Sequence, residues 1–99
     1  MKPSEALASK RDTVRELAGR FRTANIRVFG SVLHGDDSDD SDDSDLDLLV
    51  DPLPGATLFD LGGFQLELEA LLGVPVDLLT PGDLPEKFRA RVLAEARPV

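Results

Sequence analysis

Apolar residues recur at intervals of three and four in three stretches of the chain, and this spacing predicts three helices. The stretches are Ser4–Thr23, Thr57–Leu72 and Pro85–Ala96. The apolar positions that set the period are Leu7, Val14, Leu17, Ala18 and Phe21 in the first, Leu61, Phe64, Leu68, Leu71 and Leu72 in the second, and Phe88, Val92, Leu93 and Ala96 in the third. Thr57 is suited to cap the second helix and Gly73 to end it.

Two features of these helices have alternative explanations. Basic residues lie between the apolar positions of the first stretch, namely Lys10, Arg11, Arg15, Arg20 and Arg22. They could contact an acidic partner or a phosphate, but an ordinary solvated helix face is the favoured interpretation. Gly62 and Gly63 interrupt the second stretch, where each glycine costs about 1 kcal/mol relative to alanine. The close approach of another backbone or a ligand would account for this pair, and so would a kink.

Three short β-prone runs separate the helical stretches: Ile26–Phe29, Leu46–Val50 and Val74–Leu79. A brief helical turn, Ser31–His34, is expected after the first run and is closed by Gly35. Helices and strands therefore alternate in the order α-β-α-β-α-β-α. No linker or change in composition divides the chain, so we expect one domain over residues 1–99.

The formal net charge of −8 arises in one segment. Asp36–Asp47 contains eight aspartates and no basic residue, whereas the rest of the chain has 11 acidic and 11 basic residues. The triplet D-D-S occurs three times here, so residues 36–43 are predicted to form a flexible acidic loop. Such a surface repels nucleic-acid phosphates, and no basic face rich in aromatics compensates, so we expect no direct binding to DNA or RNA.

Other bulk properties narrow the setting. The chain has no cysteine, which excludes disulfides and thiolate metal sites. No apolar run approaches the length of a membrane span, and the first residues lack the apolar core of a signal peptide. We therefore expect a cytoplasmic protein without membrane contact.

The candidate chemistry begins with Asp45 and Asp47, which enter the second strand two residues apart. Successive side chains of a strand face opposite sides, so both carboxylates lie on one face, about 6.6 Å apart along the strand. Carboxylate oxygens suit Mg²⁺ that carries a substrate's phosphates. Gly30 and Ser31, after the first strand, offer backbone N–H groups and a hydroxyl for those phosphates. This stretch predicts a site for phosphoryl-type transfer.

Asp77 interrupts the apolar run of the third strand. A carboxylate in a core strand costs free energy unless it is paired or bound to a metal. Asp77 is therefore the candidate third member of a triad with Asp45 and Asp47. The alternative is that Asp77 caps a neighbouring element or lies at an exposed sheet edge. The combination with the Gly-Ser turn favours the functional interpretation.

Three separated motifs, in this order, resemble the minimal nucleotidyltransferase family of the DNA polymerase beta-like nucleotidyltransferase superfamily. They are Gly30-Ser31, Ser44-Asp45-Leu46-Asp47-Leu48-Leu49-Val50 and Val76-Asp77-Leu78-Leu79-Thr80-Pro81. The resemblance implies an α+β, nucleotidyltransferase-like fold, in which a short mixed three-stranded sheet packs with about four helices. It also implies two Mg²⁺ ions and ATP as the substrate.

The resemblance further assigns roles to single residues. Asp45 and Asp47 would hold the nucleotide metal and bridge it to the second ion, while Asp77 would complete the second site and help to deprotonate the acceptor hydroxyl. The implied nucleotide-binding residues are Gly30, Ser31, His34 and Ser44. The family usually has arginine where this chain has His34, which is mostly neutral at pH 7. His34 either weakens the hold on the triphosphate or is an ordinary surface residue.

Proteins of this family resemble antitoxins that are encoded beside a helical HEPN ribonuclease toxin. They transfer AMP from ATP to a hydroxyl of that toxin, commonly a tyrosine. The size of the chain adds an independent reason for a partner, because 99 residues offer a metal platform and no further domain to hold an acceptor. The resemblance thus predicts Mg²⁺-dependent adenylyl transfer to a HEPN toxin. The alternative is a non-catalytic antitoxin that neutralises its partner by masking it.

Overall fold

The computed structural model describes residues 3–30 and 46–99. The first of these ranges folds into two helices, α1 (Pro3–Ser9) and α2 (Arg11–Arg20), followed by strand β1 (Thr23–Phe29). The prediction of one helix over Ser4–Thr23 was wrong in this respect, because the backbone breaks at Lys10, whose φ of −118° and ψ of 18° are not helical. Arg22, with a φ of 56°, separates α2 from a strand that starts earlier than predicted.

The second range contains the remaining elements. They are β2 (Leu46–Pro52), α3 (Leu58–Leu72), β3 (Val76–Leu79), the 3-10 helix η1 (Pro81–Asp83), α4 (Glu86–Glu95) and β4 (Arg97–Pro98). Both predicted ends of α3 are confirmed: the Thr57 hydroxyl accepts from the backbone N–H of Asp60, and Gly73 ends the helix with a φ of 71°. The predicted turn Ser31–His34 and acidic loop 36–43 lie outside the described residues.

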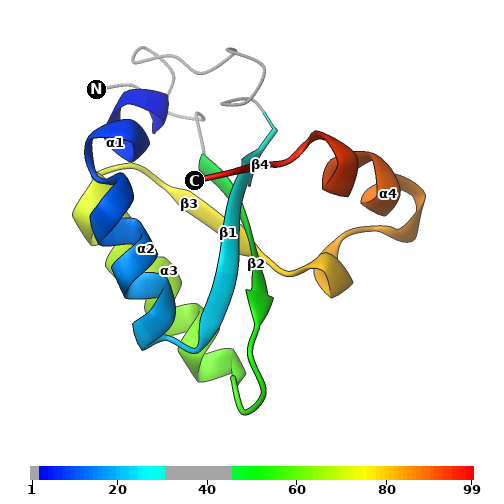
Figure 1. Ribbon diagram of the computed structural model, residues 1–99, viewed down its shortest axis with the longest axis horizontal. Helices are drawn as coiled ribbons and strands as arrows, with labels where there is room; N and C mark the ends of the chain where they lie inside the picture. The colour runs from blue at the N-terminus through cyan, green and yellow to red at the C-terminus, as the bar shows by residue number, and fades with distance from the viewer. Residues whose placement is uncertain (1–2, 31–45) are drawn as a thin grey trace.

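The strands form one mixed sheet in the order β3-β2-β1-β4. β1 runs antiparallel to β2 and to β4, whereas β2 and β3 are parallel. The predicted mixed sheet is thus confirmed, and the two-residue strand β4 is an addition to it. Helices α1, α2 and α3 lie on one side of the sheet and α4 on the other (Figure 1). The face opposite α1–α3 is therefore where side chains can meet a ligand.

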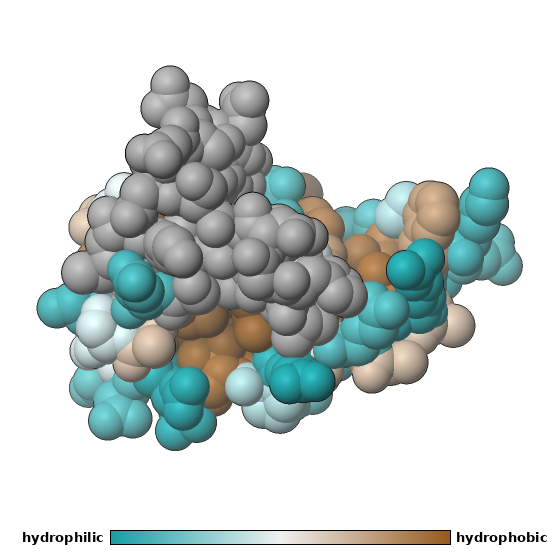
Figure 2. Space-filling view, turned by 90° about the horizontal axis from the view of Figure 1, so that it is seen from above, coloured by the Kyte–Doolittle hydropathy of each residue, from teal (hydrophilic) through white to brown (hydrophobic). Residues whose placement is uncertain are grey.

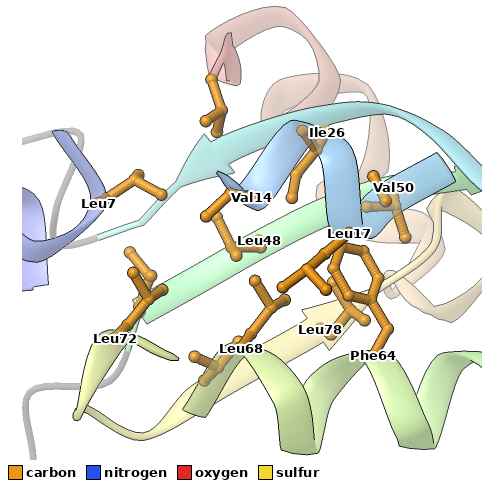
Figure 3. Close-up of a cluster of buried hydrophobic side chains, with 14 of the residues drawn as sticks. Leu7, Val14, Leu17, Ile26, Leu48, Val50, Phe64, Leu68, Leu72 and Leu78 are labelled. Atoms are coloured by element: carbon orange, nitrogen blue, oxygen red, sulfur yellow. The ribbon is translucent and has the colours of Figure 1, made fainter. Parts of the chain in front are cut away.

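The hydrophobic core lies between the sheet and helices α1–α3 (Figure 3). Alternate residues of β2, namely Leu46, Leu48 and Val50, are fully buried and point into it. The apolar positions that predicted α3 supply the opposite wall through Phe64, Leu68 and Leu72. Because one set of β2 side chains is fixed in the core, the intervening residues must face the other side of the sheet.

The polar face of α1 and α2 is exposed. The exposed basic residues are Lys10, Arg11, Arg15 and Arg20. Arg15 also donates from Nε to the backbone oxygen of Val99 at 2.8 Å and so holds β4 against α2. Among the helices of residues 3–30 and 46–99, none is long and apolar enough to cross a membrane.

The two central glycines of α3 have different surroundings. A Cβ on Gly63 would lie 3.0 Å from a ring carbon of Phe21, whereas a Cβ on Gly62 would meet no atom within 4 Å. The Phe21 ring stacks on that of Phe64, with the ring centroids 5.6 Å apart. The close approach at Gly63 is therefore made by an aromatic side chain, and not by another backbone or a ligand as the sequence suggested.

This difference predicts that two neighbouring substitutions differ in their effect on stability. Gly62→Ala should raise the free energy of unfolding by about 0.5–1 kcal/mol, because alanine restricts the unfolded chain and finds open space in the helix. Gly63→Ala should not give this gain, because the stacked rings must shift to admit the methyl group. Chemical denaturation of both variants would test the assignment. Equal stabilisation by the two would contradict it.

Candidate metal and nucleotide site

Two of the three predicted aspartates lie side by side on the sheet face opposite α1–α3. Asp47 of β2 is the register partner of Asp77 of the parallel strand β3. Register partners of neighbouring strands project to the same face, with their backbones about 4.8 Å apart. The flanking residues Leu46, Leu48, Val76 and Leu78 are buried in the core. The two carboxylates therefore leave the sheet in the same direction at the same level.

Gly30 brings the end of β1 against this pair. Its φ is +75°, a conformation that disfavours any residue with a side chain. A Cβ at this position would collide with a carboxylate oxygen of Asp47 and lie 3.2 Å from its Cγ. Glycine is needed here for two reasons: the backbone turn at the end of β1, and the space that the Asp47 carboxylate occupies.

The next acidic residue on the same face of β2 has a different role. Asp51 accepts from Arg27 at 2.7 Å and from the side-chain amide of Asn25 at 2.9 Å. Arg27 is itself fixed, since its Nε donates to the backbone oxygen of Asn25 at 3.0 Å. These contacts lie at the bulge between Ala24 and Arg27, where the pairing of β1 with β2 shifts register, and they hold the two strands together there. Asp51 is thus held as a structural anchor of the sheet.

Helix α3 holds the strand that contains Asp77. Glu69 accepts the backbone N–H of Val76 through Oε2 at 3.0 Å, and Gln65 accepts that of Leu78 through Oε1 at 3.3 Å. These are the residues before and after Asp77, on an edge strand of the sheet. Two side chains of α3 thus accept the backbone hydrogen bonds that a neighbouring strand would accept at this edge of the sheet. Sequence reasoning missed them, although polar residues four apart in an apolar helix were a visible signal.

We expect Glu69→Leu to weaken this attachment. The backbone N–H of Val76 would lose its acceptor at a cost of about 1 kcal/mol, and β3 would gain freedom beside β2. The result should be a lower free energy of unfolding and a weaker apparent affinity for a divalent cation. Glu67→Leu, at an exposed position of the same helix, is the matched control and should change the cation affinity little. Equal cation affinity in both variants would show that Glu69 does not position Asp77.

The surroundings of Asp77 differ from the prediction. The argument from the cost of a buried charge does not apply, because Asp77 is exposed on the edge strand β3. The alternative of an exposed sheet edge is therefore correct for its burial. The register with Asp47 nevertheless brings the two carboxylates together, which exposure alone would not require.

The remaining predicted site residues belong to the segment between β1 and β2. Asp45, Ser31, His34 and Ser44 all lie outside the described residues. Within residues 3–30 and 46–99, no group of three His, Cys, Asp or Glu side chains gathers. The donor chemistry of the described pair still fits a hard divalent cation, because Mg²⁺ binds through one or two carboxylates and completes its shell with water and phosphate oxygens.

The mixed sheet with its acidic pair has the architecture of a nucleotidyltransferase-like fold. Residues 10–99 match the family model of the Nucleotidyltransferase domain, so the chain belongs to this family. A solved structure assigned as a minimal nucleotidyltransferase is 43% identical, covers 97% of this chain and 95% of its own, and superposes with a TM-score of 0.82. The chain is therefore a nucleotidyltransferase of minimal size.

Two archaeal relatives are similar over most of their length. The protein adenylyltransferase MntA of Thermococcus cleftensis is 38% identical over 81 residues, which cover 82% of this chain and 79% of that protein. MJ0435 of Methanocaldococcus jannaschii, assigned as a protein adenylyltransferase, is 36% identical over 69 residues, which cover 70% of this chain and 71% of that protein.

Proposed function

We propose that the chain transfers AMP from ATP to a hydroxyl group of a partner protein. One observation carries this proposal: Asp47 and Asp77 lie in register on the face of the sheet opposite α1–α3, with the turn at Gly30 against Asp47. The names of the two archaeal relatives support AMP transfer and a protein acceptor. The resemblance in sequence to minimal nucleotidyltransferases favours a tyrosine of a HEPN ribonuclease toxin as that acceptor.

The proposed reaction is an in-line displacement at the α-phosphorus of ATP. The acceptor oxygen forms a bond to this phosphorus, the bond to the bridging oxygen of the β-phosphate breaks, and pyrophosphate leaves. Bound Mg²⁺ would neutralise the charge that develops on the attacking and leaving oxygens. Asp47 and Asp77 would hold it together with Asp45, and Asp77 would help to remove the acceptor's proton.

The other residues of the site orient the substrate. Gly30 would offer its backbone N–H to the phosphates while leaving room for the Asp47 carboxylate, and Ser31 would add a hydroxyl. Gln65 and Glu69 hold β3 in register with β2 and so keep Asp77 opposite Asp47. The expected roles of His34 and Ser44 on the triphosphate stay part of this proposal.

A transfer assay tests the proposal directly. The purified chain is mixed with the purified partner, Mg²⁺ and ATP labelled at the α-phosphate, and label on the partner is measured. Transfer should require Mg²⁺ and should be lost in the double variant Asp45→Asn, Asp47→Asn. Asp12→Asn, which changes a side chain 99% exposed on α2, is the matched control. Labelling that survives the double substitution would refute these roles.

A second function, masking of the partner, would use the exposed apolar residues of α3. Leu58, Phe59 and Leu66 of α3 are 85%, 91% and 68% exposed. Exposed apolar side chains can bury surface against a partner, and the alternative is an antitoxin that neutralises its partner by masking it. This alternative predicts that the double Asp variant still protects cells from the toxin, whereas the enzymatic proposal predicts that protection is lost.

A further inference from the structure

A hollow of about 280 Å³ lies between the end of β1 and helix α4. Its walls are Phe29, Gly30, Phe88, Arg91, Val92 and Glu95. Helix α4 contributes no buried residue, and Phe88 is 48% exposed. In Figure 2, apolar surface is visible among the hydrophilic side chains on the side of the molecule that α4 occupies. Phe88 and Val92 of α4 thus face this hollow and are not part of the buried core.

The hollow lies beside Asp47 of the acidic pair. Phe29 is the register partner of Asp47 across β1 and β2, and the Asp47 carboxylate occupies the place that a side chain at Gly30 would take. α4 stays in place because Arg89 donates to the backbone oxygens of Pro81 and Leu84, both at 2.9 Å. A ligand whose phosphates reach Asp47 therefore has this hollow beside it.

The residues that line the hollow indicate which part of a nucleotide it can bind. Two phenylalanines, a valine and a glycine suit an uncharged planar ring and disfavour phosphate. Arg91 and Glu95 form an ion pair at 3.3 Å, one turn apart on the helix. They place an N–H donor and a carboxylate acceptor at the same wall, as the edge of a nucleobase with an exocyclic amino group requires.

We propose that this hollow receives the base of the nucleoside triphosphate, and that Glu95 favours bases with an exocyclic amino group. The proposal rests on the proposed function, because the phosphates are taken to lie at Asp47 and Asp77. Stacking of a base on an aromatic side chain is commonly strong enough to change affinity tenfold or more. Phe88 would thus set affinity for the base without touching the phosphates.

Calorimetry with two probes separates the base from the phosphates. The probes are inorganic tripolyphosphate and a non-hydrolysable ATP analogue, each with Mg²⁺. Phe88→Ala should weaken binding of the analogue about tenfold and leave tripolyphosphate binding unchanged. Leu93→Ala, at a position of α4 outside the hollow and 38% exposed, is the control and should change neither affinity. Glu95→Gln should reduce the preference for the ATP analogue over the corresponding UTP analogue, because glutamine can also donate to a carbonyl.

The other outcomes are also decisive. Unchanged binding of the ATP analogue by Phe88→Ala would overturn the proposal and leave the hollow to another occupant, such as the acceptor protein. An equal loss for both probes would overturn it as well, since the effect would then be structural. Failure of the unsubstituted chain to bind tripolyphosphate with Mg²⁺ would instead refute the phosphate site of the proposed function, and the base proposal would fall with it.

Discussion

Replacing Asp77 by asparagine is expected to lower the rate of AMP transfer by at least about 100-fold. Changes to groups that only support a metal ligand already cost about 10–100-fold, and Asp77 is proposed both to bind the metal and to help take the acceptor's proton. The amide has nearly the same shape and no negative charge. Because Asp77 is exposed beside another carboxylate, its substitution should also leave the fold intact.

The test is a comparison of initial transfer rates and of thermal unfolding without metal. Asp77→Asn should unfold at the same temperature as the unsubstituted chain or slightly higher, since one of two neighbouring negative charges is removed. Asp12→Asn serves as the control for charge removal far from the pair. A rate within a fewfold of the original in Asp77→Asn would exclude a catalytic role for this aspartate.

Gly30→Ala is expected to have the second largest effect. The added methyl group collides with the Asp47 carboxylate, and the positive φ of 75° adds a backbone cost of about 1–2 kcal/mol. The carboxylate or the turn must move, and a displacement of about 1 Å at a reacting centre can cost about 100-fold in rate. The substitution should therefore reduce transfer far more than its effect on folding explains.

Gly19→Ala is the matched control for this prediction. Gly19 lies in α2, and a Cβ there would meet no atom within 4 Å. It should leave the transfer rate unchanged and stabilise the helix slightly. Transfer rates measured at a temperature where both variants are fully folded separate the two effects. Full activity in Gly30→Ala would show that the approach of β1 to Asp47 has no part in the reaction.

The apolar period predicted the elements with a continuous buried face, but it revealed neither a break within a periodic stretch nor a very short strand. The apolar positions Phe64, Leu68 and Leu72 define the buried face of α3, and the cap at Thr57 and the stop at Gly73 are observed. The break at Lys10 was not foreseen, because apolar residues continue at helical spacing on both sides of it. Strand β4 has only two residues, Arg97 and Pro98, which is too short for any period to show.

The candidate site shows a different limit of sequence reasoning. Alternation along β2 correctly placed Asp47 on the face opposite Leu46 and Leu48. The level of Asp77 relative to Asp47, however, depends on how far α3 carries the chain before β3 begins, and on the bonds from Gln65 and Glu69 that fix β3 there. The polar residues four apart on α3 are visible in the sequence, but the backbone groups that they bind on β3 are set by tertiary packing and are not.

The exposed state of Asp77 has the same origin. Its neighbours Val76 and Leu78 are buried, so an apolar run was read as a core strand. The strand order places β3 at an edge, and the face that bears Asp77 is not covered by α1–α3. Strand order is a property of the whole chain, whereas burial of a single strand is estimated from a few residues. Only the sheet topology decides between the two.

Asp47 and Asp77 are proposed to bind the same cluster of divalent ions. Titration with Mn²⁺, followed by electron paramagnetic resonance in the presence of a non-hydrolysable ATP analogue, measures this most directly. We predict that Asp47→Asn and Asp77→Asn each weaken Mn²⁺ binding at least about tenfold relative to the unsubstituted chain and to Asp12→Asn. Mn²⁺ binding that stays unchanged when Asp77 is replaced would contradict a shared metal site and, with it, the proposed mechanism.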